Sequence, residues 1–172
     1  MLVGVGITPN AYLAEDAGLE IDNGILVNER LQTSDPAIYA AGDVANAYHP
    51  FLRRTVSVEH WANARRQGAT AAKAMLGQAA VYDRLPYFFS DQYDVGMEYT
   101  GFVDPAGYDE IVFRGDVARR EFVAFWLADG RVLAGMKVNV WDVAGNIEKL
   151  ITSRRQVDPR QLADASVPLE SL

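Results

Sequence analysis

The stretch Thr33-Ser34-Asp35-Pro36-Ala37-Ile38-Tyr39-Ala40-Ala41-Gly42-Asp43 decides how this chain is interpreted. Its apolar centre, residues 38–41, predicts a short strand that ends at Gly42 and Asp43. A glycine after a strand allows the backbone to approach a bound molecule closely, and the Asp43 carboxylate is a hydrogen-bond acceptor. A Gly-Asp turn is also common where nothing binds, so an ordinary turn is the alternative interpretation.

Composition limits the classes of protein to which the chain can belong. The 172 residues, 49% of them apolar and 23% charged, are typical of a soluble protein with one domain or one domain and part of another. Sixteen basic against 23 acidic residues give a net charge of −7, which argues against nucleic acid as a partner. With no cysteine and two histidines, neither a disulfide nor a thiolate or histidine metal site is expected. No apolar run approaches the roughly 20 residues of a membrane span, so we expect a cytoplasmic protein.

The first half of the chain alternates short apolar runs with one clear helix. The run Met1–Gly6 predicts a buried strand, and because a strand at the first residue is unusual, we expect the chain to be part of something longer. Asn10 is a candidate cap for a short helix over residues 11–18, and Ile25–Val27 predicts a strand. Residues 61–77, rich in alanine and arginine, predict a helix that stops at Gly77.

The pattern changes near residues 80–86. From there the apolar runs are short, aromatic and β-branched, and turns such as Asp104-Pro105-Ala106-Gly107 separate them, which predicts an antiparallel meander. The predicted strands are Tyr87–Phe89, Val95–Phe102, Ile111–Arg114, Glu121–Leu127 and Val132–Val140. Residues 144–154 have helical spacing, and Asp158-Pro159 is a cap followed by a first-turn proline.

Several motifs, taken together, resemble the flavin-dependent pyridine nucleotide–disulfide reductase superfamily. Residues 33–43 resemble its T-x(4)-I-Y-A-x-G-D signature, and Gly6–Asn10 resembles the G-x-x-P-N segment that closes its nicotinamide domain. Residues 59–68 are similar to the E-x-W-x-N-A-x-x-Q-G helix of oxygenase-coupled ferredoxin reductases and of relatives of apoptosis-inducing factor. Residues 86–92 resemble P-x-F-W-S-D-Q, with Phe89 in place of the tryptophan and therefore without the indole N–H. Residues 94–101 continue the resemblance.

This resemblance implies an α+β fold in two parts. The first is a fragment of an α/β dinucleotide-binding FAD domain, and the second is a C-terminal reductase domain made of an antiparallel sheet and helices. Residues 1–20 would end the NAD(P)-binding domain, residues 21–82 would be the returning segment of the FAD-binding domain, and residues 83–172 would be the C-terminal reductase domain.

The resemblance also implies the cofactor contacts. Asp43 would accept a hydrogen bond from the ribitol of FAD, the amide of Val44 would face the diphosphate, and Phe89 would cover the flavin–nicotinamide region. The helix near residue 60 would point its positive N-terminus at the flavin. The implied FAD contacts are Gly42, Asp43, Val44, His60, Trp61, Ala62 and Phe89, and the implied NAD(P) contacts are Gly6, Glu59 and His60. No residue is named as catalytic, because the cofactors carry the chemistry.

The function implied is electron transfer from NAD(P)H through FAD to a ferredoxin. An acidic iron–sulfur ferredoxin would be the partner, and arginine pairs are candidates for docking it: Arg53-Arg54, Arg65-Arg66, Arg119-Arg120 and Arg154-Arg155. Neither dinucleotide-binding glycine loop occurs here, so we expect this chain alone to be inactive, to lack FAD and to self-associate. The choice between NAD and NADP stays open. So do two alternatives, a non-catalytic interaction module with the reductase fold and a relative that uses quinone or oxygen.

Overall fold

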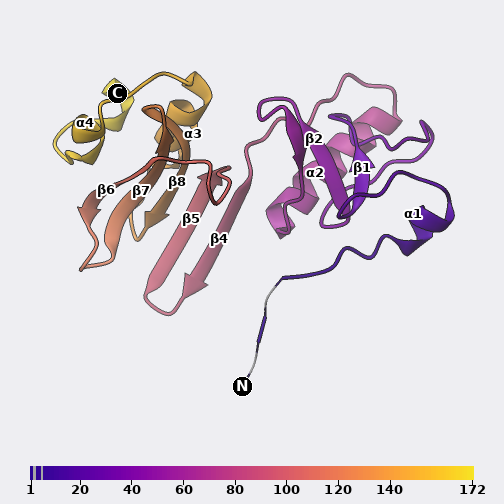
Figure 1. Cartoon of the computed structure of the whole chain (residues 1–172), viewed down its shortest axis with the longest axis horizontal. Coiled ribbons are helices and arrows are strands. Elements are labelled where there is room, and N and C mark those ends of the chain that lie inside the picture. The colour runs from indigo at the N-terminus through magenta and orange to yellow at the C-terminus, as the bar shows by residue number, and fades with distance from the viewer. Residues whose placement is uncertain (2, 5) are drawn as a thin grey trace. The chain divides into compact units, whose positions relative to one another are not determined.

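The computed structural model describes residues 1, 3–4 and 6–172 and divides the chain into two units, Met1–Arg84 and Leu85–Leu172 (Figure 1). The strand predicted over Met1–Gly6 includes residues 2 and 5, which lie outside the described residues. The described residues of that stretch are exposed and belong to no helix or strand. The assignment of residues 1–20 and 21–82 to two nucleotide-binding domains stays a prediction.

The first unit is a small sheet with one long helix. Its elements are α1 (Tyr12–Asp16), β1 (Ile25–Val27), β2 (Ala45–His49), β3 (Arg54–Val56) and α2 (Trp61–Met75). The strand order is β1-β2-β3, with β1 parallel and β3 antiparallel to β2. The predicted strand at residues 25–27 and the predicted long helix are confirmed. The predicted cap of α1 is wrong, because Ala11 is the N-cap residue and no side chain caps this helix.

The strand predicted over residues 38–41 is also wrong. In this stretch only Tyr39 forms a bridge, with Gln32, and the strand follows Gly42 and Asp43 as β2. The backbone groups here bond within their own loop: the Thr33 N–H donates to the carbonyl of Ile38, and the Ala40 N–H to that of Leu31. Because these groups are satisfied locally, the segment forms no ladder with a neighbouring strand. The core of the unit is Val27, Leu31, Ala40, Ala45, Ala47, Ala71 and Tyr82.

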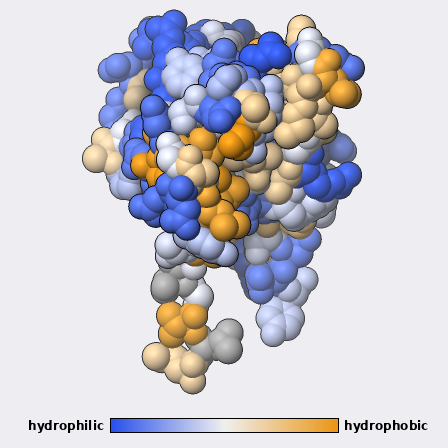
Figure 2. Space-filling model, turned by 90° about the vertical axis from the view of Figure 1, so that its right-hand side faces the viewer, coloured by the Kyte–Doolittle hydropathy of each residue, from blue (hydrophilic) through white to orange (hydrophobic). Residues whose placement is uncertain are grey.

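The first unit exposes a set of large apolar side chains. Figure 2 shows, on the side of the molecule at the right of Figure 1, a strip of hydrophobic surface bordered by hydrophilic side chains. The exposed apolar and aromatic residues of this unit include Tyr12, Leu13, Ile38, Tyr48, Trp61, Met75, Leu76 and Val81. Contiguous apolar surface on a protein commonly marks a contact with another molecule.

The second unit is a five-stranded antiparallel sheet followed by short helices. Its elements are β4 (Tyr87–Gln92), β5 (Val95–Gly101), β6 (Glu110–Asp116), β7 (Glu121–Ala128), β8 (Arg131–Val138), α3 (Ala144–Ser153), α4 (Pro159–Ala163) and the 3₁₀ helix η1 (Leu169–Ser171). The strand order is β4-β5-β8-β7-β6. The predicted antiparallel strands are thus confirmed. The simple meander is wrong, because β5 pairs with β8 and not with β6. Residues 102–109, a connection longer than a tight hairpin turn, lead from β5 to β6 at the far edge of the sheet.

The C-terminal helices pack against this sheet. Gly135 makes room for α3: a Cβ placed there would lie 2.6 Å from Cγ2 of Ile147. Arg114 of β6 holds the chain around α4 through its guanidinium, which donates to the carbonyls of Leu162, Asp164, Ala165 and Val167 at 2.7–3.3 Å. The cap predicted at Asp158 is confirmed, because its carboxylate accepts from the Arg160 N–H.

Candidate functional site

The N-terminus of α2 is fixed by side chains on both sides. His60 is the N-cap residue, and its Nδ1 accepts from the Ala62 N–H at 3.2 Å. A ring nitrogen that accepts carries no proton, so neutral His60 holds its proton on Nε2. The side-chain amide of Asn63 donates to the carbonyl of Val58 at 3.0 Å, and its oxygen accepts from the Tyr82 hydroxyl at 2.7 Å. The first turn of the helix therefore has a defined position within the unit.

The turn at Gly42 packs directly on α2. Gly42 has φ +83°, its N–H donates to Oε1 of the buried Gln67 at 2.7 Å, and a Cβ placed on it would lie 3.2 Å from Cβ of Ala64. The close contact of this backbone in the structure is with α2, and the close approach to a bound molecule that the sequence predicted stays a prediction. Asp43, the next residue, is exposed, and its carboxylate has no hydrogen bond or ion pair with the described residues. Val44 is half-buried.

Most of the predicted site residues of the first unit lie at the start of α2 or at the turn that packs on it, and Phe89 belongs to the second unit. Gly42 bonds to α2 through Gln67, and Asp43 and Val44 follow Gly42 in the chain. His60, Trp61 and Ala62 lie at the start of the same helix, one to two turns before Gln67. Glu59 is exposed just before the helix, and Gly6, also exposed, has φ +103°. Phe89 lies on β4 of the second unit, half-buried, with its ring centroid 6.4 Å from that of Tyr87.

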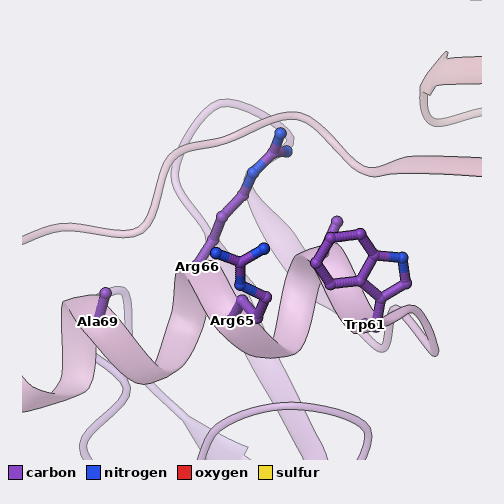
Figure 3. Close-up of a pocket in the computed structure, with 5 residues that line it drawn as sticks. Trp61, Arg65, Arg66 and Ala69 are labelled. Atoms are coloured by element: carbon purple, nitrogen blue, oxygen red, sulfur yellow. The ribbon is translucent and has the colours of Figure 1, made fainter.

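A hollow of about 330 Å³ opens on the outer side of α2. Trp61, Ala62, Arg65, Arg66 and Ala69 line it, and the guanidinium of Arg65 lies 5.0 Å from the centroid of the Trp61 ring (Figure 3). Trp61 is 53% exposed. The motifs placed Trp61 beside the flavin and the Arg65-Arg66 pair at a docking surface, as two separate features. Their i,i+4 spacing on one helix was the signal that could have joined them.

Sequence reasoning also missed Ser57, which lies between β3 and α2. Its Oγ is buried and has no hydrogen-bond partner within the described part of the chain. A lone serine offers no motif that would have revealed it. An unpaired buried hydroxyl costs free energy.

The groups at this site suit an anionic molecule that carries hydroxyls. Asp43 offers an exposed acceptor, and the start of α2 offers the positive end of a helix dipole. Residues 60–82 hold three basic side chains and no acidic one, although the whole chain has a net charge of −7. Burial raises the pKa of Tyr82, against the opposing effect of Arg66 and Arg84, so this phenol stays neutral and bonded to Asn63. These residues fit the FAD that the motifs imply.

Two further properties of residues 1, 3–4 and 6–172 bear on the site. No group of three or more carboxylate or histidine side chains there could hold a metal ion. None of the helices in that part of the chain has the length and apolar character needed to cross a bilayer.

Comparison with known proteins assigns the chain to a class and then to a family. Residues 1–68 match the family described as pyridine nucleotide-disulphide oxidoreductase. Residues 87–172, half of the chain, match the family described as reductase C-terminal, and the chain belongs to this family.

The similar proteins are ferredoxin reductases that are longer than this chain. Putidaredoxin reductase of Pseudomonas putida is 40% identical over 100% of this chain and 40% of its own length. The ferredoxin–NAD(+) reductase component of the anthranilate 1,2-dioxygenase system of Burkholderia cepacia is 42% identical over 99% of this chain and 42% of its own length. The chain thus spans about 40% of the length of these relatives.

Solved structures show the same relationship. The ferredoxin reductase for the CYP199A2 system of Rhodopseudomonas palustris superposes with a TM-score of 0.89 at 38% identity, over 98% of this chain and 41% of that one. The covalent complex of putidaredoxin reductase with putidaredoxin gives a TM-score of 0.85 at 40% identity, over 98% of this chain and 40% of that one.

Proposed function

We propose that this chain is part of a flavoprotein oxidoreductase that passes electrons from NAD(P)H through FAD to a ferredoxin. The observation that carries the proposal is similarity of about 40% along the whole chain to two proteins named as ferredoxin reductases. The site on α2 supports it, because the matched motifs lie where a turn and a helix N-terminus pack together.

The chain's own residues would bind and orient the cofactors. Asp43 would accept a hydrogen bond from a ribitol hydroxyl, and the N–H of Val44 would face the diphosphate. The α2 N-terminus, through Trp61 and Ala62, would favour negative charge on the flavin ring beside it. His60, with its proton on Nε2, would donate toward the flavin or the nicotinamide, and Glu59 and Gly6 would contact the nicotinamide. FAD itself would accept hydride and release single electrons.

The test of this proposal uses the protein that contains this chain at the full length of its relatives. We expect it to retain FAD on dialysis and to be reduced by NADH or NADPH. Asp43→Ala should lose flavin at least tenfold more readily than the wild type, because a hydrogen bond to a carboxylate contributes about 1.5–3 kcal/mol. Asp83→Ala removes another exposed carboxylate of the same unit and serves as the control. A full-length protein without flavin would contradict the proposal and favour a non-catalytic interaction module.

We further propose that the ferredoxin is acidic and docks on the outer side of α2. The support is the acid-free stretch of residues 60–82, which presents Arg65 and Arg66 beside the exposed Trp61 and Lys73 further along α2. Complementary charge mainly raises the rate of association and makes it sensitive to salt. Arg65→Glu should therefore slow ferredoxin reduction at low ionic strength and weaken its salt dependence. The same charge change at the exposed Lys149, which belongs to none of the arginine pairs, is the control, and equal effects of the two variants would refute docking at α2.

A further inference from the structure

Lys137 is the only lysine, arginine, aspartate or glutamate that is buried among the described residues. It lies on β8, the central strand of the second sheet, and its Nζ is 2.8 Å from Oε1 of Glu98 on β5. The ring of Trp141 also lies against the ammonium, with its centroid 4.8 Å from Nζ. The ammonium therefore has one carboxylate and one aromatic face in place of water.

The ion pair stands in a row with Phe89. Glu98 is paired directly opposite Lys137 across β5 and β8, and directly opposite Phe89 across β4 and β5. Residues that are directly opposite in a sheet point to the same face with their Cβ atoms about 5 Å apart. Glu98 is thus the neighbour that links Phe89, the candidate flavin contact, to Lys137.

This pair also fixes the register of the hairpin that carries Phe89. The β4–β5 hairpin joins the rest of the sheet only through the pairing of β5 with β8. A slip of one residue along that pairing would turn Phe89 to the opposite face. It would also separate the Glu98 carboxylate from the Lys137 ammonium and leave a buried charge without its partner.

Stability alone does not explain an ion pair at this position. A buried pair is commonly no more stabilising than well-packed apolar side chains of the same volume. The sheet around it already has such side chains, because Val123, the residue opposite Lys137 on β7, is buried. A methionine at position 137 would fill the same volume but would neither pair with Glu98 nor neutralise its charge. We therefore look for the role of Lys137 in its charge and in the position that the pair gives to β5.

We propose that Glu98 and Lys137 form a positioning pair that holds Phe89 in place and keeps the net charge beside it at zero. This inference rests on the proposed function, in which Phe89 covers the flavin–nicotinamide region. Reduced flavin carries more negative charge than oxidised flavin, so an unpaired Glu98 carboxylate beside Phe89 would disfavour reduction. An unpaired Lys137 ammonium would favour it.

The experiment measures the midpoint potential of the flavin bound to the full-length protein by spectroelectrochemical titration. Lys137→Met should lower the potential and Glu98→Gln should raise it, whereas the double variant should return it toward the wild-type value. Lys137→Arg keeps the charge and should have the wild-type potential. It is the variant to compare with Glu98→Gln if Lys137→Met folds poorly. Lys149→Met removes an exposed lysine of α3 and should leave the potential unchanged.

The outcomes separate this inference from the proposed function. A wild-type protein without flavin would overturn the proposed function and this inference with it. If the full-length protein binds and reduces its flavin, but the two single variants shift the potential in the same direction or not at all, the proposed role of the Glu98–Lys137 pair is overturned and the proposed function stands. A double variant that departs from the wild type further than either single variant would also overturn it, because packing and not charge would then decide the effect.

Discussion

Gly42 packs against α2 and Gly68 lies inside it, and a methyl group is expected to have opposite effects on stability at the two positions. Gly42 has φ +83°, and a Cβ placed on it would lie 3.2 Å from Cβ of Ala64, whereas a Cβ on Gly68, inside α2, meets nothing. We expect Gly42→Ala to reduce the free energy of unfolding by about 1–3 kcal/mol. Gly68→Ala should increase it by about 0.5–1 kcal/mol, because alanine is the better helix former.

Urea unfolding followed by circular dichroism checks both values. Each variant is the control for the other, since Gly42→Ala adds one methyl group beside α2 and Gly68→Ala adds one within it. If Gly42→Ala were as stable as the wild type, the turn would not need its left-handed conformation, and its close packing on Ala64 would be refuted.

Tyr99 is expected to make the free energy of unfolding fall as the pH rises in the alkaline range. Burial raises the pKa of its phenol from 10.0 to about 12. Between these values the tyrosine of the unfolded chain ionises while that of the folded chain stays neutral. The contribution to stability is therefore complete below pH 10 and is lost as the pH rises through about 12. The loss is less than the roughly 2.7 kcal/mol of two full pKa units, because Tyr99 is only partly buried.

The Tyr99→Phe variant isolates this effect from the other tyrosines. It keeps the ring that stacks on Phe88 with centroids 4.8 Å apart. The difference in unfolding free energy between wild type and variant should change across that alkaline range and stay constant below it. A difference that does not vary with pH would show that the phenol is not desolvated.

At the scale of elements, Arg114 connects β6 to the chain around α4. Its guanidinium bonds to four carbonyl oxygens between residues 162 and 167. Lysine cannot reach them all, because its donors sit on one atom and not on a planar fork. Arg114→Lys should lower the free energy of unfolding by about 2 kcal/mol. It should also speed hydrogen exchange of the backbone amides from residue 159 onward. Arg119→Lys, at an exposed ion pair, is the control, and unchanged exchange in Arg114→Lys would contradict this role of Arg114.

The elements also show where sequence reasoning succeeds. The strands of residues 87–140 are long, aromatic and bounded by turns, so their pattern alone predicts them. Residues 38–41 have the same apolar character, but Thr33 and Leu31 provide local partners for their backbone groups, and no strand forms. β2 was missed because Ala45–His49 contains no β-branched residue and only one aromatic side chain, and β3 was missed because Arg54–Val56 is only three residues long.

The candidate site divides in the same way. Gly42, Asp43 and the start of α2 belong to contiguous motifs, so a resemblance predicts them. The pairing of Glu98 with Lys137 joins strands 39 residues apart along the sequence, and no local pattern contains it. The strand order was missed for the same reason, because a meander and the observed order have identical local sequence signals.

At the scale of the whole molecule, the exposed apolar side chains of the first unit predict self-association of the 172-residue chain. A soluble monomer rarely leaves this much apolar surface in contact with water. We expect light scattering to show dimers or larger species that dissociate on dilution. Leu76→Lys, at a side chain that is 75% exposed, should shift the equilibrium toward monomer. Gln78→Lys, at an exposed polar residue nearby, is the control. A wild-type chain that is monomeric at all concentrations would contradict the prediction.

The strand order has a consequence for the time at which the sheet is completed. A ribosome releases β4 and β5 well before β8, yet β8 is the strand on which β5 lies. During synthesis β5 therefore has no pairing strand besides β4 while β6 and β7 emerge. When β8 arrives, the hairpin docks on one side of it and β7 on the other, and loop closure over this separation slows the step. The strand that carries Phe89 thus reaches its final place only after most of the polypeptide has left the ribosome.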